Sequence, residues 1–127
     1  MDLQARVRAA QKVMRLEHWH IDVKRFPDDD LDGCSAQIFF TSDQNHATIK
    51  FGRFFDGETE TEQTNTIYHE LGHCHSRDLL EDVEALKAHV APTAWVTIWE
   101  GIRRREELMI ASITEVIAPL ASKRRTK

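Results

Sequence analysis

The residues His69-Glu70-Leu71-Gly72-His73 form an HExxH motif, the part of the chain with the clearest capacity for chemistry. On an α-helix, residues four apart lie one turn along and about 40° round, so both imidazoles face one point and can bind one cation. Glu70 projects to the side of that point, where it can hold and deprotonate a water molecule without binding the metal itself. The motif therefore predicts a catalytic zinc site with His69 and His73 as ligands and Glu70 as general base.

The motif works only on a helix, and the surrounding sequence favours one. Three threonines precede it as candidate N-caps, at Thr59, Thr61 and Thr64. Ile67, Leu71 and Cys74 follow at i, i+4 and i+7, a spacing typical of a helix that buries one face. The histidine pair lies to one side of this stripe, so we expect it to face a cleft.

A catalytic zinc ion needs a third protein ligand and an open position for water. His75 is too close to His73 on the same helix to reach the same ion comfortably. The metzincin class requires a histidine six residues after the second histidine of the motif, and Leu79 stands there, which excludes this class. The third ligand must therefore lie further along the chain.

The remaining candidates are one histidine and four acidic residues: His89, Glu100, Glu106, Glu107 and Glu115. A thermolysin-type site takes a glutamate from a later helix that packs on the motif helix. Periodicity favours Glu106, because it continues the apolar stripe from Ile102 to Ile110. Glu107 lies about 100° round, at the border of this stripe, where a side chain can face a cleft. His89 would serve as in SprT-like proteins, and spacing alone leaves the choice open.

The remaining sequence predicts the elements that position this site. A helical pattern covers residues 2–16, and strand patterns cover residues 19–23, 35–41 and 46–51. We expect these strands to form an antiparallel three-stranded sheet. An edge strand beside the metal cleft could align an extended peptide by main-chain hydrogen bonds.

Further helices follow the motif. Ser76 or Asp78 can cap a short separate helix that runs to His89, and Pro92 opens a long last helix towards Pro119. The expected fold class is therefore α+β, with a small sheet, an N-terminal helix, the motif helix and a long C-terminal helix.

Length and composition limit the other possibilities. At 127 residues the chain fits one domain, to which we assign residues 1–127. Its net charge of -4 does not indicate a nucleic-acid-binding surface. The sequence shows no membrane-spanning run and no signal peptide, so we expect a cytoplasmic protein with no membrane partner. Cys34 and Cys74 form no CxxC pair and are expected to be free thiols, with Cys74 pointing away from the metal face.

Two other polar stretches are assigned no site. Asp28-Asp29-Asp30-Leu31-Asp32-Gly33 begins like an EF-hand calcium loop, but Phe39 stands at the twelfth position, where a bidentate glutamate is needed. We interpret this stretch as an acidic connecting loop. His20 falls on the polar face of the first strand, where we expect a solvated side chain.

A wider resemblance to known proteins rests on these segments: Trp19-His20-Ile21-Asp22-Val23, Ala47-Thr48-Ile49, Thr66-Ile67-Tyr68 leading into the HExxH motif, Trp99-Glu100-Gly101-Ile102-Arg103-Arg104 and Ala118-Pro119-Leu120. Through them most of the chain resembles the small zincin-like metallopeptidase family of phages and prophages, a minimal relative of the gluzincins. The resemblance implies a minimal zincin-like fold and a zinc site. Aligning on Ala118-Pro119 places the third ligand of the family at Glu107.

The chain departs from this family at one position. The ligand glutamate of the family is usually followed four residues later by aspartate, and here that residue is Ala111. The change removes a hydrogen-bond acceptor that would orient a ligand histidine.

These observations predict a zinc-dependent metallopeptidase that hydrolyses peptide bonds with a metal-activated water. Glu70 would take the proton of that water and pass it to the leaving amine. The partner is then a peptide or protein substrate, in the host cytoplasm if the protein is phage-encoded. The alternative is a zinc-stabilised, non-catalytic protein-binding module on the same scaffold. A SprT-like protease acting on DNA-bound proteins would need a basic surface, and the acidic net charge argues against it.

Overall fold

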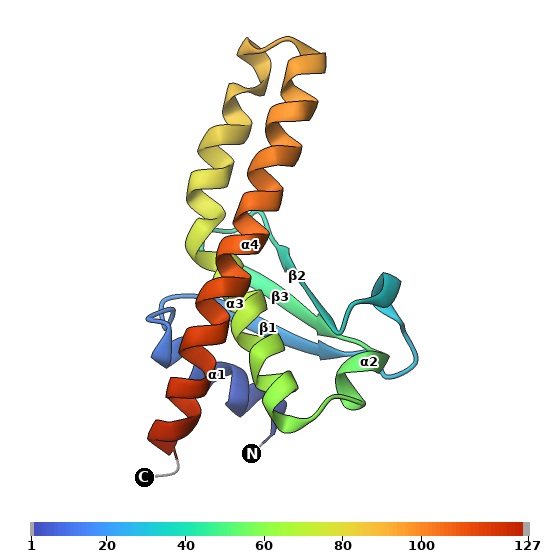
Figure 1. Ribbon diagram of the computed structural model, residues 1–127, viewed down its shortest axis with the longest axis vertical. Coiled ribbons are helices and arrows are strands. Elements are labelled where there is room, and N and C mark those ends of the chain that lie inside the picture. The colour runs from blue at the N-terminus through green and yellow to red at the C-terminus, as the bar shows by residue number, and fades with distance from the viewer. Residues whose placement is uncertain (1, 126–127) are drawn as a thin grey trace.

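The computed structural model describes residues 2–125, with side chains up to Pro119, and it has the expected α+β composition (Figure 1). In chain order the elements are α1 (Leu3–Val13), β1 (His20–Arg25), the 3-10 turn η1 (Leu31–Gly33), β2 (Ala36–Phe40), β3 (His46–Phe51), α2 (Arg53–Asp56), α3 (Glu60–Glu84), the 3-10 turn η2 (Ala85–His89) and α4 (Pro92–Arg125). α3 and α4 run antiparallel and extend past the sheet as a helical hairpin (Figure 1). No helix in the described part of the chain is long and apolar enough to cross a membrane.

The sheet is mixed, with the strand order β1-β3-β2. β2 pairs antiparallel with β3, as expected, but β1 pairs parallel with β3. An antiparallel sheet was expected because consecutive strands pair in a meander. Instead, β3 lies in the middle of the sheet, between β1 and β2. The segment 26–35 connects β1 to β2 across the position that β3 occupies. β2 is therefore an edge strand, and α3 packs against it.

One face of the sheet forms the core. Ala47, Ile49 and Phe51 alternate along β3 and are almost completely buried, as the period of two requires. They pack in one cluster with apolar side chains of α1 and α3, among them Val7, Ala10, Ile67 and Leu71. The alternate residues of β1 and β3 lie on the opposite, polar face.

α3 is one continuous helix of 25 residues. Thr59, one of the three threonines predicted as candidate N-caps, is the N-cap of this helix. It forms a capping box with Glu62. The predicted helix break at Ser76 or Asp78 is wrong. The Ser76 hydroxyl donates to the carbonyl oxygen of His73 and to the Glu106 carboxylate, so this polar side chain is satisfied inside the helix. The chain leaves the α-helix at η2.

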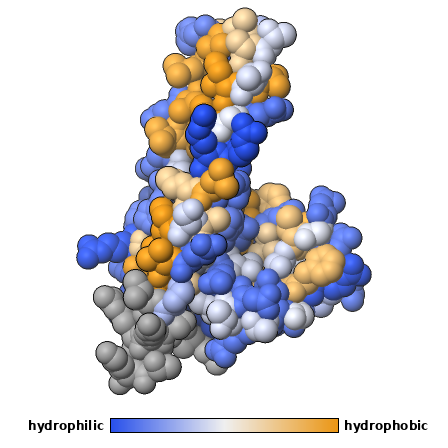
Figure 2. Space-filling view, viewed as in Figure 1, coloured by the Kyte–Doolittle hydropathy of each residue, from blue (hydrophilic) through white to orange (hydrophobic). Residues whose placement is uncertain are grey.

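α4 starts at Pro92, as predicted, and runs to Arg125 with Pro119 inside it. Trp95 is buried and stacks on Trp99, with ring centroids 5.3 Å apart. Apolar side chains gather on the surface of the α3–α4 hairpin (Figure 2). Among the residues that the structure describes, none covers this apolar surface of the hairpin.

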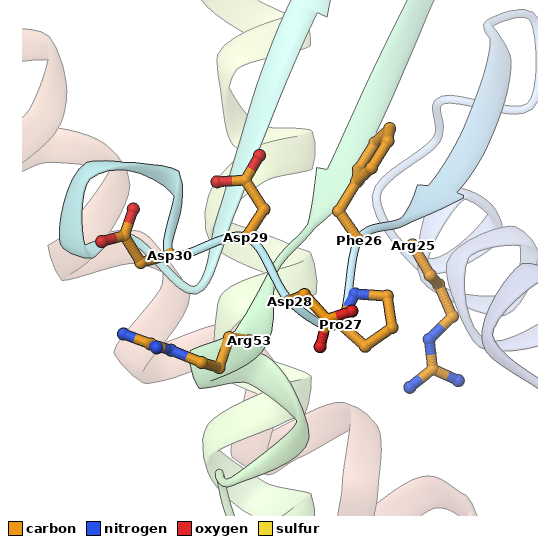
Figure 3. Close-up of a pocket in the computed structure, with 7 residues that line it drawn as sticks. All are labelled: Arg25, Phe26, Pro27, Asp28, Asp29, Asp30 and Arg53. Atoms are coloured by element: carbon orange, nitrogen blue, oxygen red, sulfur yellow. The ribbon is translucent and has the colours of Figure 1, made fainter.

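The acidic segment before β2 is a connecting loop. The Asp29 carboxylate accepts a hydrogen bond from the backbone N–H of Leu31, and Asp30 accepts one from Asp32. Asp28, Asp29 and Asp30 point in different directions near Arg25 and Arg53 (Figure 3). The carboxylates of Asp29 and Asp30 therefore stabilise the turn, and the three aspartates do not surround a common point.

Candidate metal centre

The three residues predicted as metal ligands lie together where α3 meets α4. Nε2 of His69 is 3.0 Å from Oε2 of Glu107, and Nε2 of His73 is 3.1 Å from Oε1 of the same carboxylate. The two imidazole rings lie 5.5 Å apart at an angle of 72°. One ligand atom from each residue lies within 4.8 Å of the others. The ends of three metal-binding side chains thus converge on one point.

This arrangement fits a zinc ion. Zinc binds nitrogen and oxygen ligands at about 2.0–2.2 Å, so neighbouring ligand atoms of a tetrahedral site lie about 3.3 Å apart. The two nitrogen–oxygen distances of 3.0 and 3.1 Å are close to this value. Two histidines and a glutamate are also a donor set that catalytic zinc sites use, with the fourth position left for water or substrate.

Glu106, next to Glu107, has a different environment. Its side chain is 4% exposed, whereas that of Glu107 is 47% exposed. The Glu106 carboxylate lies 3.4 Å from Nδ1 of His73 and 2.8 Å from Nη1 of Arg103, and it accepts the hydrogen bond from Ser76. Because it contacts the ring nitrogen that faces away from Glu107, Glu106 holds His73 with Nε2 towards Glu107.

Glu106, the residue before Glu107, thus supplies a carboxylate to Nδ1 of His73, whereas the side chain of Ala111 has no acceptor. Sequence reasoning weighed Glu106 only as a competing ligand. The signal for its supporting role was its place on the buried stripe of the helix, which a carboxylate occupies only when it is paired. Ser76 and Arg103 were missed, because their contacts with Glu106 depend on how the helices pack.

Glu70, a residue of α3, lines the same cleft, and β2 lies across this cleft from it. Burial raises the pKa of its carboxyl to about 8, the nearby charge of Glu107 adds to this shift, and a hydrogen bond from the backbone N–H of Ile38 opposes it. A cation bound to the three ligands would favour the ionised form. An ionised carboxylate beside a bound cation can take a proton from water, as a general base must.

The cleft over the cluster has a volume of about 700 Å³. β2 forms one wall, and Arg77, Trp99 and Arg103 from the helical hairpin line another part of it. A space of this size can admit part of a peptide chain. The cluster is thus open to a substrate-sized molecule.

The backbone of β2 has a defined orientation beside the cleft. Thr41 donates its N–H to the carbonyl oxygen of His46, and Ser35 accepts from Gly52, so odd-numbered positions of this segment face β3. Hydrogen-bonding groups alternate between the two sides of a strand. The N–H and C=O groups of Ala36, Ile38 and Phe40 therefore point towards the open edge, in agreement with the Ile38–Glu70 hydrogen bond.

The other sequence candidates lie elsewhere. His89 is exposed in η2 at the far end of the hairpin, and Glu100 and Glu115 are exposed on α4. The ring of His75 contacts the carbonyl oxygen of Met14 at 2.9 Å. Among the described residues, none of these four joins a metal-ligand cluster.

The two cysteines are free, with Cys34 exposed and Cys74 buried. Burial raises the pKa of the Cys74 thiol to about 12, and the charge of Glu70 adds to the shift. Cys74 is therefore a neutral thiol at physiological pH, unsuited to act as a nucleophile.

No protein-family model, curated protein or solved structure matches this chain.

Proposed function

We propose that the protein is a zinc-dependent peptidase whose metal is held by His69, His73 and Glu107. The observation that carries this proposal is the convergence of three metal-binding side chains beside Glu70, in a cleft bordered by an edge strand. Bound zinc supplies Lewis acidity, which lowers the pKa of a coordinated water and polarises a carbonyl group.

Glu70 moves the proton in this mechanism. Its carboxylate takes a proton from the attacking water and returns it to the amine that leaves. The Ile38 N–H donates to this carboxylate. Glu106 acts through His73, which it orients.

β2 aligns the substrate. An extended peptide in the cleft can pair with the outward N–H and C=O groups of this edge strand, which places a main-chain amide beside the metal position. Such pairing recognises the backbone, and side-chain preference then comes from the walls. Arg77 and Arg103 line one wall, where Arg77 pairs with Glu81 and Arg103 with Glu106.

The test is zinc content and peptide cleavage measured on untagged protein. We expect about one zinc ion at this site in the wild type, lost in Glu107→Ala and kept in Glu100→Ala, which removes an exposed glutamate of the same helix. Glu70→Gln should keep zinc and fold but lose cleavage of a peptide library. Unchanged zinc in a folded Glu107→Ala variant would contradict the proposed ligand set.

The apolar surface of the hairpin favours one alternative, a zinc-stabilised module that binds a protein without cleaving it. The two functions differ in the role of Glu70. For a binding module, Glu70→Gln leaves function unchanged and the wild type cleaves nothing, whereas loss of His69 destabilises the fold.

A further inference from the structure

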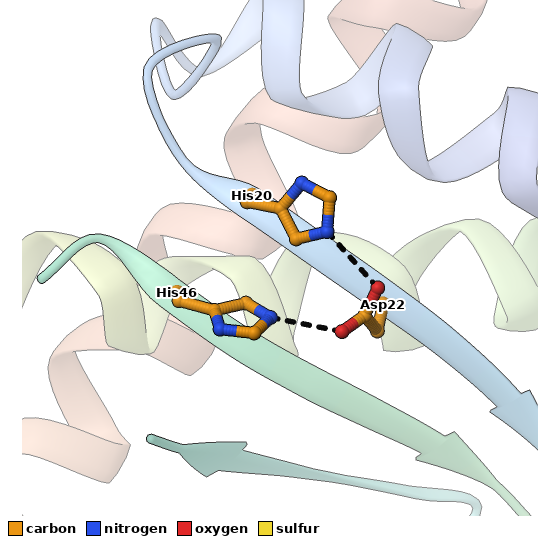
Figure 4. Close-up of side chains that lie close together, drawn as sticks. All are labelled: His20, Asp22 and His46. Carbon is orange, nitrogen blue, oxygen red and sulfur yellow. Dashed lines mark hydrogen bonds and ion pairs between the residues drawn. The ribbon is translucent and has the colours of Figure 1, made fainter. Parts of the chain in front are cut away.

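A second cluster of metal-binding side chains lies on the polar face of the sheet. It consists of His20 and Asp22 from β1 and His46 from β3 (Figure 4). His20 and Asp22 are two residues apart on one strand and so share a face, and His46 is the direct partner of His20 in the parallel pair. None of the three lines the cleft of the first cluster.

The three side chains converge. Nε2 of His20 is 3.1 Å from Oδ1 of Asp22, and Nε2 of His46 is 2.8 Å from Oδ2. The two rings are 4.9 Å apart, and one ligand atom from each residue lies within 4.8 Å of the others. This donor set of two imidazoles and one carboxylate repeats that of His69, His73 and Glu107.

The cluster is also held firmly. All three residues belong to paired strands, and the backbone N–H of His20 donates to the carbonyl oxygen of Asn45 at 2.8 Å. Sites on paired strands keep their ligand geometry better than sites on loops. The three side chains can therefore bind a cation without a rearrangement of the backbone.

The local charge favours a cation. Both imidazoles contact the carboxylate of Asp22, whose Oδ2 lies 2.8 Å from Nε2 of His46. A second carboxylate, that of Asp43, lies 3.8 Å from Nδ1 of His46, and the groove next to His20 is lined by Glu17 and Arg8. Lys24, the next residue of β1 on this face, is the basic group nearest in sequence.

Surface ion pairing does not by itself explain the arrangement. The side chains of His20 and Asp22 are 72% and 46% exposed, and that of His46 is 26% exposed. Ion pairs in such exposed positions contribute little to stability. A single histidine would satisfy the charge of Asp22, whereas here two imidazoles direct Nε2 to the same carboxylate.

We propose that His20, Asp22 and His46 form a second binding site for a divalent transition-metal ion, of the class of Zn²⁺. Imidazole nitrogen with one carboxylate suits zinc and its neighbours better than calcium or magnesium, which prefer oxygen ligands. The exposure of His20 leaves coordination positions open to solvent. A metal at this site joins β1 to β3 where both strands begin.

The test is a Zn²⁺ titration of the untagged, metal-stripped protein by calorimetry and elemental analysis. The wild type should bind two equivalents, and the double variant His20→Ala/His46→Ala one. Asp22→Asn, which keeps the size of the side chain, should weaken the affected equivalent by about tenfold or more. His18→Ala removes an exposed histidine near the cluster and should still bind two equivalents.

A variant at the first site separates this proposal from the proposed function. His69→Ala should also bind one equivalent, and combining it with His20→Ala/His46→Ala should abolish binding. If the wild type binds one equivalent that is lost only in the double variant, the second site stands and the first fails. If His20→Ala/His46→Ala, still folded by circular dichroism, binds as many equivalents as the wild type with equal affinity, the second site is refuted.

Discussion

Gly72, in the middle of the HExxH motif, lies directly against Ile110 of α4. A Cβ atom placed on Gly72 would lie 2.7 Å from Cγ2 of Ile110, closer than carbon atoms can approach. Ile110 is buried one turn after Glu107 on the same helix. This close contact therefore sets the distance between the helices at which Glu107 meets the histidines of α3.

We predict that the effect of Gly72→Ala on stability depends on Ile110. Alanine gains up to about 1 kcal/mol of helix propensity over glycine, but overpacking costs about 1–3 kcal/mol. In the wild type the clash should dominate, so that stability falls and zinc affinity falls with it as α4 moves away. In an Ile110→Ala background the clash is gone, and Gly72→Ala should be neutral or stabilising.

The wild type, Gly72→Ala, Ile110→Ala and the double variant form a double-mutant cycle. Chemical denaturation of these four proteins measures the coupling between positions 72 and 110. Equal effects of Gly72→Ala in both backgrounds would show that the helices do not meet at this point. Gly101→Ala is a control on the same helix pair, since the nearest atom to a Cβ there is Nη1 of Arg105, at 3.5 Å.

The second prediction concerns Glu106. Glu106→Gln keeps the three ligands but weakens the acceptor for Nδ1 of His73, so zinc affinity should fall by about 10–100-fold without being lost. Glu107→Gln changes a ligand and should have the larger effect. Competition with a fluorescent chelator measures both, with Glu100→Gln as control. Wild-type affinity in a folded Glu106→Gln protein would mean that this carboxylate does not orient His73.

The sequence predicted the parts of this centre that are local. Residues i and i+4 of a helix share a face whatever the fold, so the pairing of His69 with His73 followed from spacing alone. Periodicity also placed Glu106 on the buried stripe and Glu107 at its border. It could not tell which of the two binds a metal, because that depends on the rotation of α4 against α3, which the Gly72–Ile110 contact helps to set.

The second cluster was out of reach for a related reason. His20 was expected to be solvated, and it is exposed. Its neighbour His46 is 26 positions away, and the two come together only because β1 pairs parallel with β3 in one particular register. In the antiparallel meander that the strand patterns suggested, β3 would lie beside β2 alone. Strand patterns show which side chains share a face but not which strands pair.

The third prediction concerns pH and Glu70 in the metal-free protein. The pKa of Glu70 is raised from 4.5 to about 8, so the folded state holds a proton that the unfolded state releases. The unfolded state binds fewer protons in this window, and stability must fall as pH rises from about 4.5 to about 8. Glu70→Gln removes this titration, so its stability should change less with pH.

Urea denaturation in a chelating buffer at pH 5, 6, 7 and 8 tests this. The wild type should lose stability relative to Glu70→Gln at each step towards pH 8. Adding zinc should reverse the difference, since a cation favours the ionised carboxylate. Parallel pH profiles of the two proteins without metal would show that Glu70 titrates normally.

The last prediction uses the alternation of hydrogen bonds along β2. Ile38 directs its N–H to Glu70 and the open edge, whereas Phe39 directs its N–H to β3. Proline has no N–H and is tolerated on an edge strand only where that group is not needed for pairing. Ile38→Pro should therefore leave the protein folded, while Phe39→Pro should cost about 1–3 kcal/mol, because it removes a ladder hydrogen bond and leaves the acceptor on β3 unpaired.

Ile38→Pro should still alter the site. Without the N–H donor the carboxylate form of Glu70 loses a stabilising contact, so the pKa of Glu70 should rise further and peptide cleavage at neutral pH should slow. Thermal unfolding separates the two proline variants, and the pH dependence of stability reports Glu70 without requiring activity. Equal destabilisation by both prolines would mean that Ile38 also pairs with β3, and the outward edge of β2 would then not be free to align a substrate.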